Sequence, residues 1–130
     1  MSTEVVSFQE LKPAGPLVFV QYPNILVRHA TTTRIGGVSL APFDSLNVGT
    51  TSPDDQDHVA QNRALVSQHL GINAIARLSM NHGNRVEVFR EIPDAASARP
   101  SADACITATP GLSLSITTAD CVPILFYCPK

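Results

Sequence analysis

A single long helical pattern, set among many short strand-like runs, is the feature that most constrains the fold. We predict a helix over residues 53–70 because apolar side chains recur there at helical spacing. Ser52 suits the N-cap, Pro53 suits the first helical position, and Gly71 suits the C-cap. The apolar face of this helix would consist of Val59, Val66 and Leu70.

The rest of the chain alternates short apolar runs with loops rich in Gly, Pro, Ser, Thr and Asn. Such runs predict short strands, with a turn around Pro23-Asn24 and loops over residues 30–52 and 93–103. One helix among many strands indicates an α+β domain with mixed β-sheets. The predicted strands are residues 17–20, 25–29, 76–80, 85–89, 104–107, 112–117 and 122–127, and residues 1–16 form a loose lead-in.

Length and charge restrict the function classes. The chain has 130 residues and 44% hydrophobic residues, which fits one globular domain with a real core. The net charge is −2 and no cluster of Lys and Arg occurs, so nucleic acid is not an expected partner. No apolar run reaches the length of a membrane span, and the first residues lack the basic and apolar segments that a signal peptide would have. We therefore expect a cytoplasmic protein with no membrane partner.

Cysteine and histidine carry the chemistry that this sequence offers. Three cysteines without CxxC spacing argue against a disulfide framework and leave room for a reactive or ligating thiol. Cys121 stands beside Asp120 where an apolar run begins, and His82 precedes Gly83 between two predicted strands. A thiolate and an imidazole brought together can ligate a metal or form a nucleophile–base pair. We interpret Cys105 and Cys128 as core residues.

Several motifs occur in an order that resembles the YfiH-like family, whose older label is multicopper polyphenol oxidase or laccase. The resemblance covers about residues 25–127, and five ordered motifs at compatible spacing make it specific. The motifs are Thr33-Arg34-Ile35-Gly36-Gly37-Val38-Ser39, Asp44-Ser45-Leu46-Asn47-Val48-Gly49, Asn62-Arg63, His82-Gly83 and Thr118-Ala119-Asp120-Cys121-Val122-Pro123.

The resemblance implies a CNF1/YfiH-like α+β fold with flanking helices and a zinc-dependent purine nucleoside phosphorylase with added adenosine deaminase activity. The implied substrates are phosphate and a purine nucleoside: adenosine, inosine or methylthioadenosine. In the family, one zinc ion is bound by the positions of His82 and Cys121 and by a second His in an HAGWRG-type motif. No such motif occurs here. We therefore interpret residues 1–130 as the N-terminal, truncated portion of one YfiH-like domain and expect weak zinc binding.

Residue chemistry agrees with these implied roles. Zinc lowers the pKa of bound water, and Asp120 could orient that water or move its proton. Arg34 is the best candidate for phosphate because its guanidinium fork matches phosphate oxygens, and Asn47 could hydrogen-bond the ribose or phosphate. Each residue also has a structural interpretation: Arg34 as an exposed loop charge, Asn47 as a turn cap, and His82 as the hydrogen-bonded end of a strand. Arg63 and Asn62 would tie the helix to the loop.

Other functions compete with this one. A multicopper oxidase needs many histidines, and the chain has 4, so zinc is favoured over copper. A cysteine hydrolase would use Cys121 as nucleophile and His82 as base. A non-catalytic, shortened relative would bind a nucleoside or another subunit, and an exposed final strand would favour a homodimer.

Overall fold

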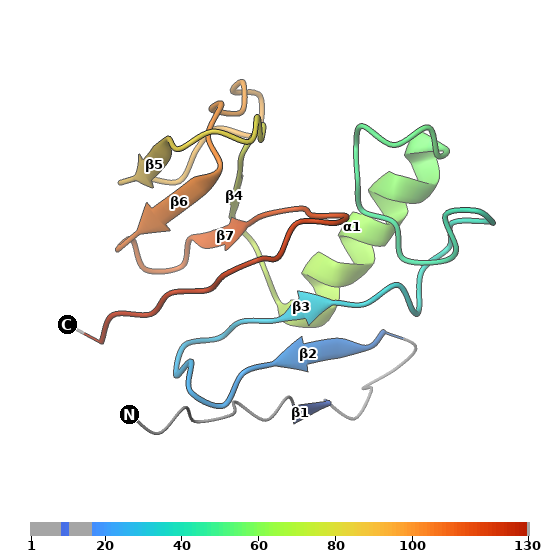
Figure 1. Ribbon diagram of the computed structural model, residues 1–130, viewed down its shortest axis with the longest axis horizontal. Helices are drawn as coiled ribbons and strands as arrows, with labels where there is room; N and C mark the ends of the chain where they lie inside the picture. Colours follow the sequence, from blue (N-terminus) through green and yellow to red (C-terminus); the bar gives the residue numbers. More distant parts are fainter. Residues whose placement is uncertain (1–8, 11–16, 130) are drawn as a thin grey trace. The chain divides into compact units, whose positions relative to one another are not determined.

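A computed structural model describes residues 9–10 and 17–129 of the chain and contains one helix and several small sheets (Figure 1). This content confirms the predicted α+β fold class. The chain divides into two compact units: a first unit with the residues up to Val66 and from Val122 onward, and a second unit, Ser67–Cys121. The elements are β1 (Gln9–Glu10), β2 (Phe19–Gln21), β3 (Thr31–Thr32), α1 (Gln56–Leu70), β4 (Ile75–Arg77), β5 (Val86–Phe89), β6 (Ala104–Thr107) and β7 (Ser113–Ser115).

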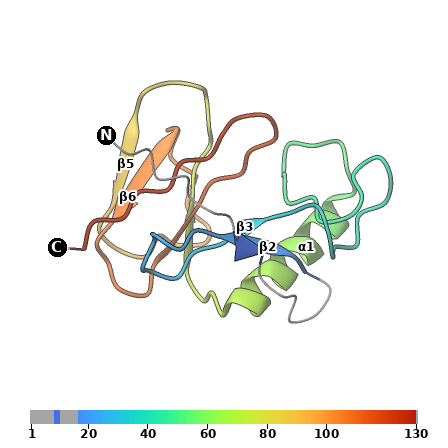
Figure 2. The ribbon, with the colours of Figure 1, turned by 60° about the horizontal axis from the view of Figure 1, so that its bottom comes forward.

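The first unit consists of a small antiparallel sheet with most of α1, up to Val66, beside it. The strands lie in the order β1-β2-β3, and β2 pairs with β3 through Phe19 opposite Thr32. Figures 1 and 2 both show α1 alongside β2 and β3. No helix in the described ranges is long and apolar enough to cross a membrane. The buried apolar side chains of this unit come from the strand region, the loop and the helix: Leu17, Phe19, Leu46 and Val59.

The helix begins later than the sequence predicts and ends where predicted. Ser52 was expected at the N-cap, but its hydroxyl donates to Gly49 O at 2.8 Å and so belongs to the loop. Asp55 caps the helix instead, because its Oδ1 accepts from Asp57 N at 2.8 Å. At the other end Gly71 has a φ of 62°, which glycine adopts without a Cβ clash.

The C-terminal turn of α1 closes with two further hydrogen bonds. Gly71 N donates to Gln68 O at 3.2 Å, and Ile72 N donates to Ser67 O at 2.8 Å. This pair of bonds is the Schellman arrangement, which satisfies carbonyls that the helix leaves without a partner.

The predicted strand at residues 25–29 is wrong. A turn closes from Ile25 N to Tyr22 O at 3.1 Å, as predicted around Pro23-Asn24, but no strand follows it. The His29 ring explains the difference, since its Nε2 accepts from Tyr22 N at 2.8 Å and its Nδ1 lies 2.7 Å from Val27 O. These bonds occupy backbone groups that a strand ladder would need, and the sheet resumes only at β3.

The second unit contains two parallel strand pairs. β4 pairs with β7, and β5 pairs with β6 with Val86 opposite Ala104. The connection between β5 and β6 is an irregular loop, as predicted for residues 93–103, with one isolated bridge between Ser79 and Ser101. The core of this unit consists of Ala76, Leu78, Phe89, Ala102 and Leu112, and Cys105 packs at its edge.

The predicted strand at residues 122–127 is also wrong. The segment carries strand-like residues but has no ladder in the described part of the chain. Its apolar side chains face solvent, and Val122 and Phe126 are 83% and 91% exposed. Without a neighbouring strand to accept its backbone groups, apolar sequence alone does not form a strand. Of the predicted lead-in, residues 9–10 form β1, and the remainder lies outside the described residues.

Candidate functional site

His82 lies in a turn that follows the β4 region and precedes β5. Its φ is 58°, the left-handed conformation that non-glycine residues rarely adopt. Three consecutive backbone N–H groups of this turn donate to the Asp103 carboxylate: Asn81 N at 3.0 Å, His82 N at 2.7 Å and Gly83 N at 2.7 Å. These bonds, that of Gly83 foremost, hold the pKa of Asp103 below its usual value because they favour the charged carboxylate. The turn is therefore wrapped around a carboxylate.

Cys121 comes close to His82 although 39 residues separate them in sequence. The Cys121 Sγ lies 3.9 Å from His82 Nδ1, and both side chains are exposed. The fold thus brings together the thiol and the imidazole that the sequence singles out. Asp120, beside the cysteine, is exposed as well.

The spacing of this pair suits two ligands of one zinc ion. With Zn–N near 2.05 Å and Zn–S near 2.3 Å, a tetrahedral zinc would separate the nitrogen and the sulfur by about 3.6 Å. The observed 3.9 Å is a few tenths of an ångström longer. Within residues 9–10 and 17–129, no group of three or more His, Cys, Asp or Glu side chains is placed to hold a metal. The imidazole and the thiol therefore suit two of the ligand positions of a zinc ion, and the described residues supply no third ligand beside them.

The other two cysteines lie in different environments. Cys105 on β6 is partly buried against the core, and burial raises the pKa of its thiol. Its predicted place in the core is therefore correct in part. Cys128 was also expected in the core but is exposed, because the segment that carries it forms no strand.

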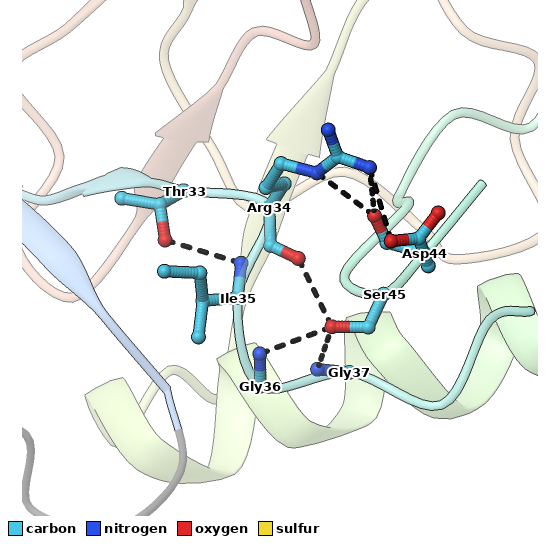
Figure 3. Close-up of polar contacts among 7 residues, drawn as sticks. All are labelled: Thr33, Arg34, Ile35, Gly36, Gly37, Asp44 and Ser45. Carbon is cyan, nitrogen blue, oxygen red and sulfur yellow. Dashed lines mark hydrogen bonds and ion pairs between the residues drawn. The ribbon is translucent and has the colours of Figure 1, made fainter. Parts of the chain in front are cut away.

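Arg34, the expected phosphate contact, belongs to the first unit and is held by Asp44 (Figure 3). Its Nη2 lies 3.2 Å from Asp44 Oδ2, and its Nε donates to Asp44 O at 2.9 Å. The side chain is 71% exposed, and Figure 3 shows Nη1 pointing away from Asp44. One edge of the guanidinium is thus fixed within the loop, and the opposite side faces outward.

The two loop glycines do not offer their amides to a ligand. Gly36 N and Gly37 N both donate to Ser45 Oγ at 3.2 Å, and the same hydroxyl donates to Arg34 O at 3.0 Å (Figure 3). The backbone amides that a glycine-rich loop could present to phosphate are therefore used inside the loop.

Asn47, the other expected substrate contact, is engaged by its own loop. Its Nδ2 donates to Ser52 Oγ at 2.8 Å and to Asp54 Oδ2 at 3.0 Å, and its Oδ1 accepts from Gly49 N at 3.0 Å. These contacts are those of a turn cap, the structural interpretation that the sequence also allows.

Asn62 and Arg63 tie α1 to this loop, as predicted. The Asn62 side chain is fully buried, its Oδ1 accepts from Val38 N at 2.8 Å, and its Nδ2 donates to Asn47 O at 2.8 Å. The same Nδ2 also lies within hydrogen-bond distance of Ser39 Oγ at 2.9 Å and Ser45 O at 3.2 Å. Arg63 Nε donates to Val48 O at 2.7 Å.

Sequence reasoning missed Asp103 and Asp44. Asp103 immediately precedes β6, and the pairing of β5 with β6 and the bridge between Ser79 and Ser101 bring it to the turn at residues 81–83. Asp44 begins one of the family-like motifs, which is the signal that could have drawn attention to it as the partner of Arg34.

The fold and the paired side chains define an α+β protein with a candidate thiol–imidazole site. Residues 28–130 match the family described as multi-copper polyphenol oxidoreductase laccase, and the chain belongs to this family. The family description names copper, and curated relatives carry a different name.

Those relatives are called purine nucleoside phosphorylases. The protein from Deinococcus radiodurans is 44% identical over 119 residues, which are 90% of this chain and 45% of that protein. The Escherichia coli protein YfiH is 39% identical over 113 residues, which are 85% of this chain and 45% of that protein. The chain therefore spans about half the length of the curated relatives that it matches.

Two solved structures share the fold. YlmD from Geobacillus stearothermophilus superposes with a TM-score of 0.67 at 27% identity, covering 84% of this chain and 44% of that one. The Neisseria meningitidis protein NMB0706, of the family DUF152, gives a TM-score of 0.62 at 31% identity, covering 88% of this chain and 42% of that one. These likenesses support the α+β fold class.

Proposed function

We propose that the chain carries the chemistry of a zinc-dependent purine nucleoside phosphorylase that also deaminates adenosine. Phosphorolysis would convert adenosine or inosine and phosphate into the free base and ribose 1-phosphate, and methylthioadenosine into adenine and 5-methylthioribose 1-phosphate. Deamination would add water at C6 of adenosine and release ammonia, giving inosine. The observation that carries the proposal is the approach of Cys121 Sγ to His82 Nδ1 at 3.9 Å, and the names of the relatives support the reaction class.

The residues of the second unit would serve the deamination. His82 and Cys121 would be two ligands of the zinc, which when bound lowers the pKa of water toward neutrality. Asp120 is exposed next to Cys121, where its carboxylate could orient a water molecule and accept its proton. A zinc site is preferred to copper because neither reaction transfers electrons and because 4 histidines are too few for several copper ions.

The residues of the first unit would bind the substrates. Asp44 fixes the Nε edge of Arg34, which keeps the guanidinium extended with Nη1 outward, and the remaining N–H groups could donate to phosphate oxygens. Asn47 is proposed as a ribose or phosphate contact. For Asn47 this role requires that a ligand share or replace its bonds to Ser52 and Asp54.

The test is an assay of both reactions on the purified 130-residue chain with adenosine, zinc and phosphate, with base and inosine separated by chromatography. We expect slow, phosphate-dependent release of base, and slow formation of inosine that disappears in His82→Ala and Cys121→Ser and persists in Cys128→Ser, the matched exposed cysteine. Inosine formation that survives both ligand substitutions would contradict the proposal. Fast turnover would contradict the expectation that the pair needs a third ligand.

A cysteine hydrolase is a second candidate because the same 3.9 Å contact would place a histidine base beside a thiol nucleophile. A chelator and a thiol alkylator separate the two. Loss of activity with the chelator and its return with added zinc support the phosphorylase, whereas activity that resists chelation but not alkylation supports the hydrolase.

A non-catalytic relative that associates with itself is a third candidate. The exposure of Val122 and Phe126 favours it, because apolar side chains on an extended segment can pair with another copy. Sedimentation equilibrium tests this candidate, and a monomer at every concentration would remove it.

A further inference from the structure

The turn that carries His82 is held in an unfavourable conformation by one carboxylate. Three successive N–H groups point to the same side of the chain, and Asp103 accepts all three. A left-handed φ at a residue with a side chain costs free energy, so an interaction from outside the turn must maintain it. Asp103 is the partner that the structure supplies.

Asp103 is itself attached to the core of the second unit. Its backbone N donates to Arg85 O at 3.2 Å, at the start of β5. The preceding residue, Ala102, is fully buried in the core, and Ala102 N donates to Ser79 O at 3.2 Å. Asp103 is therefore held from both sides of the turn, by Ser79 before it and by Arg85 after it.

We propose that Asp103 is a positioning residue that sets the His82 ring beside Cys121. The inference rests on the proposed role of the two side chains as metal ligands. Fixing the His82 backbone fixes the direction of its Cα–Cβ bond, so only two side-chain torsions remain to bring Nδ1 to within 3.9 Å of Cys121 Sγ. Groups that hold metal ligands in place commonly contribute about 10- to 100-fold to metal affinity.

Cobalt(II) provides the probe, because thiolate coordination of cobalt gives a charge-transfer absorption band and cobalt occupies the nitrogen and sulfur sites that zinc prefers. The band would be titrated in the unaltered 130-residue chain, in Asp103→Asn, in Asp103→Glu and in the control Asp94→Asn. Asp94 is a suitable control because it also accepts a backbone N–H, from Ala96 at 3.0 Å, in the same unit.

We expect Asp103→Asn to weaken cobalt binding about tenfold or more. An amide has one acceptor oxygen, and its NH2 group would face a backbone N–H of the turn that Asp103 now accepts. Asp103→Glu, which keeps the charge but displaces it by one methylene, should fall between Asp103→Asn and the unaltered chain. Asp94→Asn should bind as the unaltered chain does. In the absence of metal, the amide proton resonance of His82 should shift in Asp103→Asn and stay in place in Asp94→Asn.

The outcomes separate the two claims. Circular dichroism first shows whether Asp103→Asn is folded. If the folded variant and the unaltered chain bind cobalt equally well, the positioning role is overturned and the proposed metal site is not. If Asp103→Asn does not fold, Asp103→Glu decides: weaker binding supports the inference and unchanged binding overturns it. Absence of a thiolate–cobalt band in the unaltered chain overturns the proposed metal site, and the inference with it.

Discussion

Replacing Asn62 by alanine tests how the loop of residues 34–47 is held on α1. The Asn62 side chain is fully buried. Its Oδ1 accepts from Val38 N, and the two hydrogens of its Nδ2 are shared among Ser39 Oγ, Ser45 O and Asn47 O, so three full hydrogen bonds form at a time. Each bond contributes about 1 kcal/mol net, and a buried group left without a partner costs about 1–3 kcal/mol. Alanine returns about 0.6 kcal/mol through its higher helix propensity.

Together these contributions predict that Asn62→Ala lowers the free energy of unfolding by about 3–5 kcal/mol. For a domain of this size that corresponds to a fall in Tm of roughly 10–20 °C. The assay is urea unfolding followed by circular dichroism, with thermal unfolding beside it. Gln61→Ala is the matched control, because Gln61 is the exposed neighbour on the same helix. Its free energy of unfolding should change by less than about 0.5 kcal/mol.

A loss below about 1 kcal/mol for Asn62→Ala would refute the reasoning, because it would mean that water or a rearranged loop replaces the hydrogen bonds of the Asn62 amide. A large loss in Gln61→Ala would refute it equally, since the helix itself and not the buried amide would then determine stability.

Three further predictions concern the loop and the ends of α1. Gly37→Ala should destabilise the chain by several kcal/mol, because the added Cβ would overlap the backbone oxygen of Ser45; a normal Tm would count against this packing. Gly71→Ala should cost about 1 kcal/mol at its φ of 62°, measured by urea unfolding, and no change would argue against the left-handed cap. The pKa of Asp54 is lowered, foremost by the hydroxyl of Ser39, so its stabilisation is present above the unfolded-state pKa and is lost as pH falls below about 4. Thermal unfolding between pH 6 and pH 3 should therefore show a smaller acid-induced fall in Tm for Asp54→Asn, and an equal fall would contradict the assignment.

Local sequence signals predicted the elements whose boundaries depend on local interactions. The apolar run predicted as a strand at residues 104–107 forms β6. Gly71 ends α1 as predicted, since the residue type alone indicates a left-handed cap. The start of α1 was misplaced because Ser52 found partners in the loop, which neighbouring residues do not reveal. Residues 122–127 look like a strand, but a strand also needs a pairing partner.

The candidate site shows the same division. Residue types and motif order were sufficient to single out His82 and Cys121, and the fold places the two side chains in contact. The contribution of Asp103 depends on the register of β5 against β6, which no spacing in the sequence encodes. The Arg34–Asp44 pair likewise depends on how the loop of residues 34–47 folds back on itself.

The most direct test of the account is the zinc bound by the purified chain in equilibrium dialysis against zinc, measured by elemental analysis on both sides of the membrane, because this method also detects a weakly bound ion. We predict zinc that is lost in Cys121→Ser and in His82→Ala and is retained in Cys128→Ser. Zinc that remains in Cys121→Ser and His82→Ala, or zinc absent from the unaltered chain, would contradict the claim that the thiol and the imidazole form a metal site.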